Sequence, residues 1–288
     1  MSPLQVLPPR AVEVLACPVC GAALAALPGD AGLRCAGGHS FDRARQGHVT
    51  LLAPGSRPPS GDSAEMVADR GTFLDAGHFA GVTAALTAAV LCDGAPARTV
   101  LDLGGGTGHH LAAVLDDLPD AVGVVLDSSR YAARRAARVH PRALAVVADT
   151  WRRLPVRDAV LDRVLVAFAP RNGPEIARVL RPDGRLVVVT PAPDHLHELV
   201  GPLGLLRVDP DKPARLAASL EPYLDRVASA RHREVLPLDR AAVLTLVGMG
   251  PHARHLARRE VETAVAALPA PVPVTVSVEV ATYAPART

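Results

Sequence analysis

A cluster of glycines between residues 104 and 108 constrains this chain more than any other feature. It follows the apolar residues Val100, Leu101 and Leu103 of an expected buried strand, and an apolar helix is expected from Leu111. A strand that turns through glycine into a helix lets the backbone approach a ligand and leaves free N–H groups at the helix N-terminus. The stretch therefore predicts a nucleotide-binding corner in an α/β fold.

The spacing of these glycines distinguishes two kinds of nucleotide site. The dinucleotide fingerprint needs a small residue three positions after its second glycine, but His109 stands there. The pattern present is Asp102-x-Gly104-x-Gly106-x-Gly108. It resembles the first motif of class I S-adenosylmethionine (SAM) methyltransferases. Taken alone, the pattern favours SAM only modestly over a dinucleotide, and an ordinary glycine-rich turn is a further alternative.

From Arg98 onward, apolar strands alternate with helices, which predicts a mostly parallel sheet with helices on both faces. Two helices, from residue 64 to near 77 and over 80–91, precede the first strand. Later strands are expected at 121–126, 143–148, 162–167 and 185–190, and helices at 111–118, 129–139, 174–180, 195–203, 213–220, 239–249 and 253–268. Two long extended segments, 224–236 and 273–283, could form an antiparallel hairpin at the sheet edge. A plain dinucleotide-binding fold lacks such an antiparallel pair at its C-terminal edge.

Residues at the carboxyl ends of the strands are the candidates for the site, because ligands of such sheets lie there. Asp127 suits ribose hydroxyls, with a helix cap as the alternative, and Asp149 suits an adenine amino group, with a plain loop carboxylate equally favoured. Phe168 offers a face for a flat base, although it could equally belong to the core. Arg171 could donate to a carbonyl oxygen or a phosphate. His195 follows the last of these strands near a helix start.

Three of the four cysteines lie near the N-terminus, in two close pairs with a histidine. The pattern is Cys17-x2-Cys20 followed by Cys35-x3-His39. Three thiolates and one imidazole suit a closed, tetrahedral and structural Zn²⁺ site. Free cysteines beside a surface histidine are the alternative, which the paired spacing disfavours. Such a small module has little core of its own, so the metal would supply much of its folding energy.

Composition and charge set outer limits. The chain has 288 residues, 49% of them hydrophobic, and a formal net charge of +2, which does not by itself indicate a nucleic-acid-binding protein. The sequence predicts a zinc module over 1–52, a Pro- and Gly-rich linker over 53–62 and a catalytic domain over 63–288. It shows no targeting segment and no continuous apolar stretch long enough for a membrane span. Few, unevenly placed cysteines favour the cytoplasm over an oxidising compartment.

The order of the short motifs resembles one known family, the bacterial 23S rRNA (guanine-N1)-methyltransferases. The likeness runs from Cys17 to the C-terminus. It rests on the zinc pattern, His39-Ser-Phe-Asp42, Gln46-Gly-x-Val49, Gly61-Asp-Ser-Ala-Glu-Met66, Phe73-Leu-Asp-Ala-Gly-His78, Asp102-x-Gly-x-Gly106, Leu126-Asp127, Ala169-Pro170, Thr190-Pro191 and His195-Leu196. The stretches 104–110, 168–172 and 201–207 are similar to the subgroup linked to resistance to tylosin-type macrolides.

The resemblance implies a reaction, its partners and several residue roles. The reaction is methylation of guanine N1, at nucleotide 748 or 745, in a domain II hairpin loop of 23S rRNA, supplied as an RNA hairpin or a ribosomal subunit, by a homodimer. Gly106, Thr107 and His195 would contact SAM. So would Phe79, which stands where many members have tyrosine. Gly71 stands where relatives often have arginine, so one phosphate contact would be lost.

The mechanism requires loss of the guanine N1 proton, to a base or through a polarised O6, and no sequence feature identifies that base. Phe168 and Trp151 are the aromatic candidates for stacking a splayed-out base, and Trp151 could equally cover the core. Two alternatives stay open at this point. One is a SAM methyltransferase acting on a small molecule, which the zinc module disfavours. The other is a zinc- and RNA-binding protein without activity, which the intact Asp102, Gly104, Gly106 and Asp127 disfavour.

Overall fold

The computed structural model describes residues 6–56, 61–205, 218–250, 253 and 257–286. The N-terminal elements are α1 (Pro9–Glu13), β1 (Leu24–Ala26), the 3-10 turn η1 (Pro28–Asp30), β2 (Gly32–Cys35), β3 (Ser40–Asp42) and β4 (Val49–Thr50). The larger part that follows contains α2 (Ala64–Asp75), α3 (Ala80–Leu91), β5 (Thr99–Leu103), α4 (His109–Asp117), β6 (Val122–Asp127), α5 (Arg130–Ala136), β7 (Ala143–Val147), β8 (Leu161–Ala167), α6 (Gly173–Val179), β9 (Leu180–Pro191), α7 (His197–Leu203), β10 (Leu224–Leu238), α9 (Arg240–Gly248), α10 (Arg258–Ala266) and β11 (Val272–Pro285).

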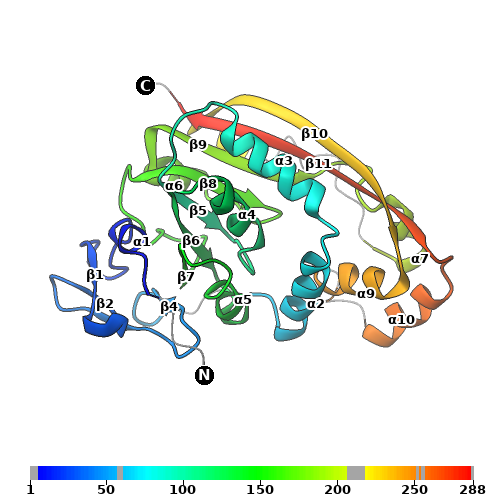
Figure 1. The fold of residues 1–288 in the computed structure, drawn as a ribbon, viewed down its shortest axis with the longest axis horizontal. Helices are drawn as coiled ribbons and strands as arrows, with labels where there is room; N and C mark the ends of the chain where they lie inside the picture. Colours follow the sequence, from blue (N-terminus) through cyan, green and yellow to red (C-terminus); the bar gives the residue numbers. More distant parts are fainter. Residues whose placement is uncertain (1–5, 57–60, 206–217, 251–252, 254–256, 287–288) are drawn as a thin grey trace.

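An eight-stranded sheet organises the molecule, in the order β10-β11-β9-β8-β5-β6-β7-β4 (Figure 1). The strands from β4 to β9 pair in parallel, whereas β11 runs antiparallel to both β9 and β10. The inner strand β5 is buried along its whole length, which its apolar sequence favours. One hydrophobic cluster packs on each face of the sheet. The structure confirms the predicted parallel sheet and its antiparallel C-terminal edge.

Side-chain caps fix where three of the helices begin. Ser63 accepts a hydrogen bond from the Met66 N–H, and Ser129 accepts one from the Ala132 N–H. These contacts make Ser63 the cap of α2 and Ser129 the cap of α5. Asp239 caps α9 in the same way. Since α5 directly follows β6, its cap holds the end of that strand at the sheet edge where a ligand would lie.

The cysteine-rich N-terminal segment forms a three-stranded antiparallel sheet, β1-β2-β3, beside the large sheet (Figure 1). Its core is continuous with that of the catalytic part, because the buried Leu24 and Leu33 belong to the same cluster as Leu101. Its last strand, β4, pairs with β7, with Val49 opposite Val146. The proposed boundary at residue 52 thus separates two parts that share one core and one sheet.

Several expected elements differ from those in the structure. The strand β9 begins at Leu180 rather than 185, and α10 covers only 258–266 of the expected helix 253–268. The expected helix 213–220 lies mostly outside the described residues. Within the described ranges, no single helix is long and apolar enough to cross a membrane. The pair α2 and α3, bent by 83°, satisfies length and composition together.

Candidate active site and metal centre

The side chains of Cys17, Cys20, Cys35 and His39 converge on one point in the N-terminal sheet, with all four donor atoms within 4.8 Å of one another. His39 Nδ1 lies 3.4 Å from Cys35 Sγ and 3.6 Å from Cys17 Sγ. The sulfur atoms of Cys20 and Cys35 are 3.7 Å apart. Tetrahedral Zn²⁺ with bonds of about 2.3 Å separates its sulfur ligands by about 3.8 Å. The cluster therefore fits the metal without rearrangement.

The backbone around the cluster is shaped for a metal knuckle. Gly21 follows Cys20 with φ at +74°, a conformation that glycine adopts without strain, and its N–H donates to the Cys17 carbonyl over 2.8 Å. Burial alone raises the pKa of Cys35. Hydrogen bonds with His39 and the neighbouring cysteines together outweigh that effect and bring the pKa down to about 6. A thiol so perturbed is readily deprotonated, which a zinc ligand requires.

The glycine-rich turn lies at the carboxyl end of β5, as expected. Gly104 and Gly106 have φ values of +70° and +56°, so the turn depends on left-handed conformations. A Cβ added at Gly105 would collide with the Asp102 carboxylate, which packs directly beneath the turn. Thr107 is buried within it. The turn thus exposes backbone rather than side chains at the edge of the sheet.

Two carboxylates support this turn in different ways. Asp102 is 1% exposed, and neither of its oxygens has a hydrogen-bond partner among the described residues. Burial, and secondarily the charge of Asp127, raises the pKa of Asp102 to about 7. Asp127 instead accepts hydrogen bonds from the N–H groups of Gly106, at 2.9 Å, and Ser129, at 2.7 Å. An unpartnered buried carboxylate is costly, so Asp102 is suited to a cationic or hydrogen-bond-donating ligand.

An aromatic row continues the site beyond the turn. The Phe168 ring lies 6.0 Å from the Phe79 ring and 6.0 Å from the stacked His195 ring. Phe79 is buried at the start of α3, whereas Phe168 is 40% exposed and has φ at +56°. His195 Nδ1 accepts a hydrogen bond from the Ser277 N–H over 3.2 Å, so in the neutral ring Nε2 carries the proton. The structure brings together three residues that lie far apart in the sequence.

The other predicted site residues lie at the expected edge with different surroundings. Asp149 follows β7, where one carboxylate oxygen accepts from the Trp151 N–H at 2.9 Å and the other lies 3.4 Å from Arg152 Nε. This arrangement resembles the loop carboxylate that was its alternative role. Arg171 is half-buried near Tyr283, and its Nε has no hydrogen-bond partner in the described part of the chain. Burial lowers the pKa of Arg171.

Sequence reasoning missed two residues beside the turn. Arg70 on α2 pairs with Asp62 at 2.5 Å, and a Cβ at Gly106 would lie 3.1 Å from its guanidinium. His110 is half-buried in the first turn of α4, where its Nδ1 lies 2.9 Å from the Thr83 hydroxyl. Desolvation lowers the pKa of His110 to about 3. No local pattern singles out Arg70, because its position over the turn depends on how α2 packs.

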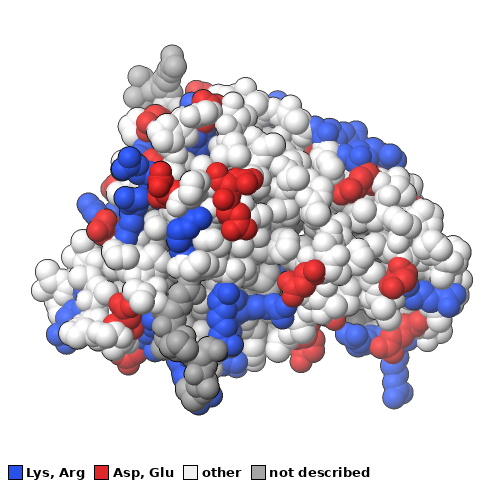
Figure 2. All heavy atoms as spheres, in the orientation of Figure 1, with Lys and Arg blue, Asp and Glu red and all other residues white. Residues whose placement is uncertain are grey.

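Basic side chains do not form one continuous field on the face that Figure 2 draws. On the face in Figure 2, arginines lie next to acidic residues, and another group follows the edge strand β10. Arg226, Arg231 and Arg233 lie on that strand. Arg231 and Arg233 both pair with Asp194, at 2.5 and 3.0 Å. These pairs fix the loop that carries His195. Although burial opposes the shift, a hydrogen bond with Ser277 and the pairs with Arg233 and Arg231 hold the pKa of Asp194 well below its usual range.

The fold, the glycine turn and the Cys3His cluster define a class I SAM-dependent methyltransferase with an N-terminal zinc ribbon. The family model for the RlmA N-terminal zinc ribbon matches residues 15–55, and a methyltransferase-domain model matches residues 100–184. A solved complex of a methyltransferase with the Trm112 activator of Haloferax volcanii has a chain with the same fold. The TM-score is 0.51 at 18% identity, over 77% of this chain and 95% of that chain.

Curated relatives give the family. The 23S rRNA (guanine(748)-N(1))-methyltransferase of Streptomyces fradiae is 49% identical, over 90% of this chain and 92% of its own. A Micromonospora griseorubida protein, described as a candidate 23S rRNA (guanine-N1)-methyltransferase, is 52% identical over 96% of this chain and 99% of its own. The chain belongs to the 23S rRNA (guanine-N1)-methyltransferase family, as its motifs predicted.

Proposed function

We propose that this protein transfers a methyl group from SAM to N1 of a guanine in 23S rRNA. The observation that carries the proposal is the half-exposed Phe168 ring, stacked with His195 beside the glycine turn. A flat base laid on Phe168 would lie next to the cofactor edge of the sheet. The membership of the family and the zinc ribbon packed on the same core support RNA as the acceptor.

The cofactor site combines the turn with the residues around it. Bound SAM supplies an electrophilic methyl group on a sulfonium. Asp102 would balance the positive charge of the cofactor, and Asp127 would accept from its ribose hydroxyls, since each carboxylate oxygen can accept a second hydrogen bond. The remaining contacts of the proposed cofactor site come from Phe79, Gly104, Gly106, Thr107, Asp149 and His195.

The acceptor site must orient guanine and remove its N1 proton. Bound SAM would supply the methyl group to N1 with its thioether as the leaving group, and the N1 proton would leave to solvent. Phe168 holds the base in line with the methyl group, which is the main catalytic requirement of such a displacement. Arg171 donates to O6 and so stabilises the anion that forms when N1 loses its proton.

The target nucleotide, the form of the RNA substrate and the oligomeric state are proposed by analogy with the named relative and the family. We propose guanine 748 as the target, because it is the position in the name of the Streptomyces fradiae protein. Resistance to tylosin-type macrolides is the proposed consequence, which the likeness to the resistance-linked subgroup supports. The substrate is the domain II hairpin, free or within a ribosomal subunit, and the enzyme acts in the cytoplasm as a homodimer. Guanine 745 is the alternative target in the same loop.

The test uses tritiated SAM with three acceptors: a domain II transcript, large ribosomal subunits and a pool of small aromatic acceptors. We expect label in RNA and a reverse-transcription stop next to guanine 748, because N1-methylguanine cannot pair. A transcript with adenine at that position is the control. Label only in small molecules, or labelled RNA without a stop, would contradict the proposal.

A further inference from the structure

The segment 149–158, which connects β7 to β8, touches both the zinc ribbon and the proposed acceptor site. On the ribbon side, the Pro155 carbonyl accepts from the Ala16 N–H over 3.0 Å, and the Arg157 N–H donates to the Val14 carbonyl over 2.9 Å. The Arg157 side chain also donates to the Glu13 carbonyl over 3.1 Å. The backbone just before the zinc ligands is thus joined to this connecting segment.

The other side of the connecting segment is joined to the loop that carries Phe168. Asn172 donates through its amide to the carbonyls of Thr150, at 3.2 Å, and Arg152, at 3.1 Å. The Leu154 N–H donates to Glu175 on α6 over 2.8 Å. The backbone of the segment is therefore fixed from both sides, which leaves its outward side chains on a rigid support.

Three successive side chains on this support face solvent. Trp151 is 59% exposed, although a tryptophan usually contributes to a core. The side chains of Arg152 and Arg153 are 73% and 67% exposed. Core packing does not explain an exposed indole on a fixed backbone. An aromatic ring next to guanidinium groups is the combination that binds single-stranded nucleic acid, by stacking on bases and pairing with phosphates.

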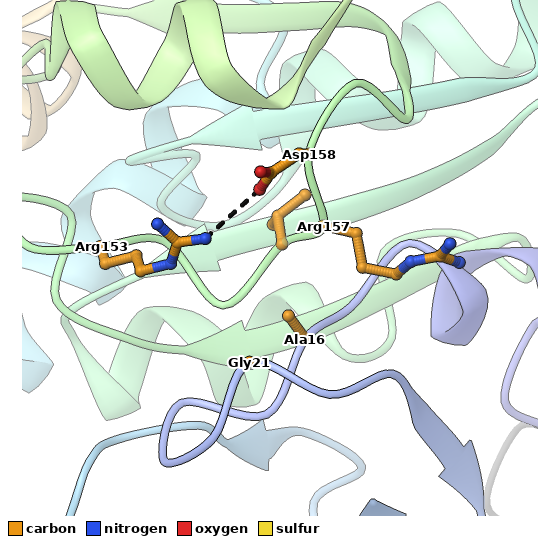
Figure 3. A pocket seen from close by; sticks show the side chains of 6 residues that line it. Ala16, Gly21, Arg153, Arg157 and Asp158 are labelled. Carbon is orange, nitrogen blue, oxygen red and sulfur yellow. Dashed lines mark hydrogen bonds and ion pairs between the residues drawn. The ribbon is translucent and has the colours of Figure 1, made fainter.

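A pocket lies where the connecting segment meets the zinc knuckle. Its walls are Ala16, Gly21 and Val156, with Arg153, Arg157 and Asp158 as its charged groups. Figure 3 shows Arg153 and Arg157 on opposite sides of the pocket, and the backbone of the zinc ribbon at Gly21 lies below them in this view. Asp158 is paired with Arg153 at 3.3 Å and also with Arg178. Two guanidinium groups, Arg153 and Arg157, face this single carboxylate, which Arg178 also pairs with, so the pocket keeps positive character that suits a phosphate group.

We propose that the connecting segment is an RNA-binding strip between the zinc ribbon and the methyl-transfer site. Trp151 stacks an unpaired base that flanks the methylated guanine, and Arg153 and Arg157 bind a backbone phosphate in the pocket. This proposal rests on the proposed function, since it assumes RNA as the acceptor. Its RNA-binding side chains, Trp151, Arg153 and Arg157, are separate from the residues proposed to hold the cofactor.

The chain contains one tryptophan, so fluorescence excited at a wavelength that its three tyrosines do not absorb reports on Trp151 alone. We expect a domain II transcript, added to the full-length protein saturated with SAM, to quench this fluorescence by stacking. Trp151→Ala should weaken RNA binding about tenfold, whereas Trp151→Phe should retain most of it. Arg153→Ala should lower the salt dependence of binding by about one phosphate contact. The exposed Arg259 of α10 provides the control substitution Arg259→Ala.

Absence of binding, or binding by gel shift without a change in fluorescence, would overturn the proposal. So would a Trp151→Ala protein that binds the transcript as the wild type does, or equal quenching by heparin. SAM affinity, measured by calorimetry, should be the same in all variants and verifies that each is folded. Quenching without methyl label in guanine would contradict the proposed function while supporting RNA binding by the strip. Methyl label without quenching would support the proposed function and contradict the strip.

Discussion

At the scale of single residues, the buried Asp102 has the largest consequence. Its carboxylate is enclosed beneath the glycine turn without a hydrogen-bond partner in the described structure. Burial raises its pKa from 3.8 to about 7. The folded protein therefore binds a proton there that the unfolded chain releases at lower pH. Ionisation of Asp102 destabilises the protein until a cationic ligand compensates for it.

We predict that the ligand-free protein loses stability as pH rises from 4 to 7, by up to about 4 kcal/mol from this group. The isosteric Asp102→Asn cannot ionise, so its melting temperature should fall less over that range. The affinity of the wild type for SAM should rise with pH through about 7, as the carboxylate forms. Thermal melts and calorimetry over this range measure both effects. Parallel melting profiles for the two proteins would contradict this account.

The conformation of Phe168 leads to a second prediction. Its φ of +56° is unfavourable for any residue with a Cβ, and this penalty is about 1 kcal/mol. Phe168→Gly should therefore be more stable than Phe168→Ala by about that amount. Neither variant has the ring that would stack guanine, so both should lose methyl transfer at least tenfold. Chemical denaturation and the tritium assay separate the two effects. A more stable alanine variant would show that the strain is absent.

The residues of the site differ in how well sequence alone reveals them. The zinc ligands and glycine turn were predicted because each has a fixed local spacing, and the structure brings their atoms together. Arg70 was missed, because only the packing of α2 places it over Gly106. For Asp149, the sequence predicted its position after a strand at the ligand-binding edge of the sheet, but not which groups its carboxylate contacts. One oxygen accepts a hydrogen bond from the Trp151 N–H and the other pairs with Arg152, both within its own loop, and no spacing rule predicts that choice.

At the scale of elements, the zinc ribbon shares its interior with the catalytic part. The ribbon's own strands are three or four residues long, too short to enclose a core. Leu33 is fully buried in the cluster that also contains Leu101 and Leu126. The metal and the neighbouring sheet therefore stabilise the ribbon together. Loss of the metal, or of core packing in the sheet, should lower the stability of both the ribbon and the catalytic part.

Removal of zinc should destabilise the entire protein rather than the ribbon alone. We predict one zinc ion per chain by mass spectrometry, and a lower melting temperature for the catalytic part after chelation or in Cys35→Ser. Cys92 lies outside the cluster and is exposed, so Cys92→Ser is the matched control and should change neither value. A chelated protein that melts like the zinc-loaded one would argue against a structural metal.

At the scale of the whole molecule, the two hydrophobic clusters lie on opposite faces of one sheet and connect distant parts of the chain. One extends from Leu7 near the N-terminus to Tyr283 near the C-terminus. The antiparallel pair β10–β11, whose connection contains α9 and α10, forms one edge of that sheet, and β4 forms the other. Unfolding should therefore be cooperative across the zinc ribbon and the catalytic part, despite their different sequence signatures.

We predict a single calorimetric transition for the zinc-loaded protein. Leu33→Ala, a change within the ribbon, should lower the stability of that single transition by about 2–5 kcal/mol. Val227→Ala, at an exposed position on β10, is the control and should have a much smaller effect. Two separate transitions, with only the smaller shifted by Leu33→Ala, would show that the ribbon folds independently.

The pairing of β4 with β7 limits how such a protein can diversify. Val49 and Thr50 lie within the residues that the zinc-ribbon family model matches, yet they form the outermost strand of the methyltransferase sheet. Exchange of the ribbon between relatives would replace an edge strand of the catalytic sheet at the same time. A ribbon of altered sequence must therefore arise by gradual substitution within a fixed frame, or be inherited together with β7, the strand that β4 pairs with.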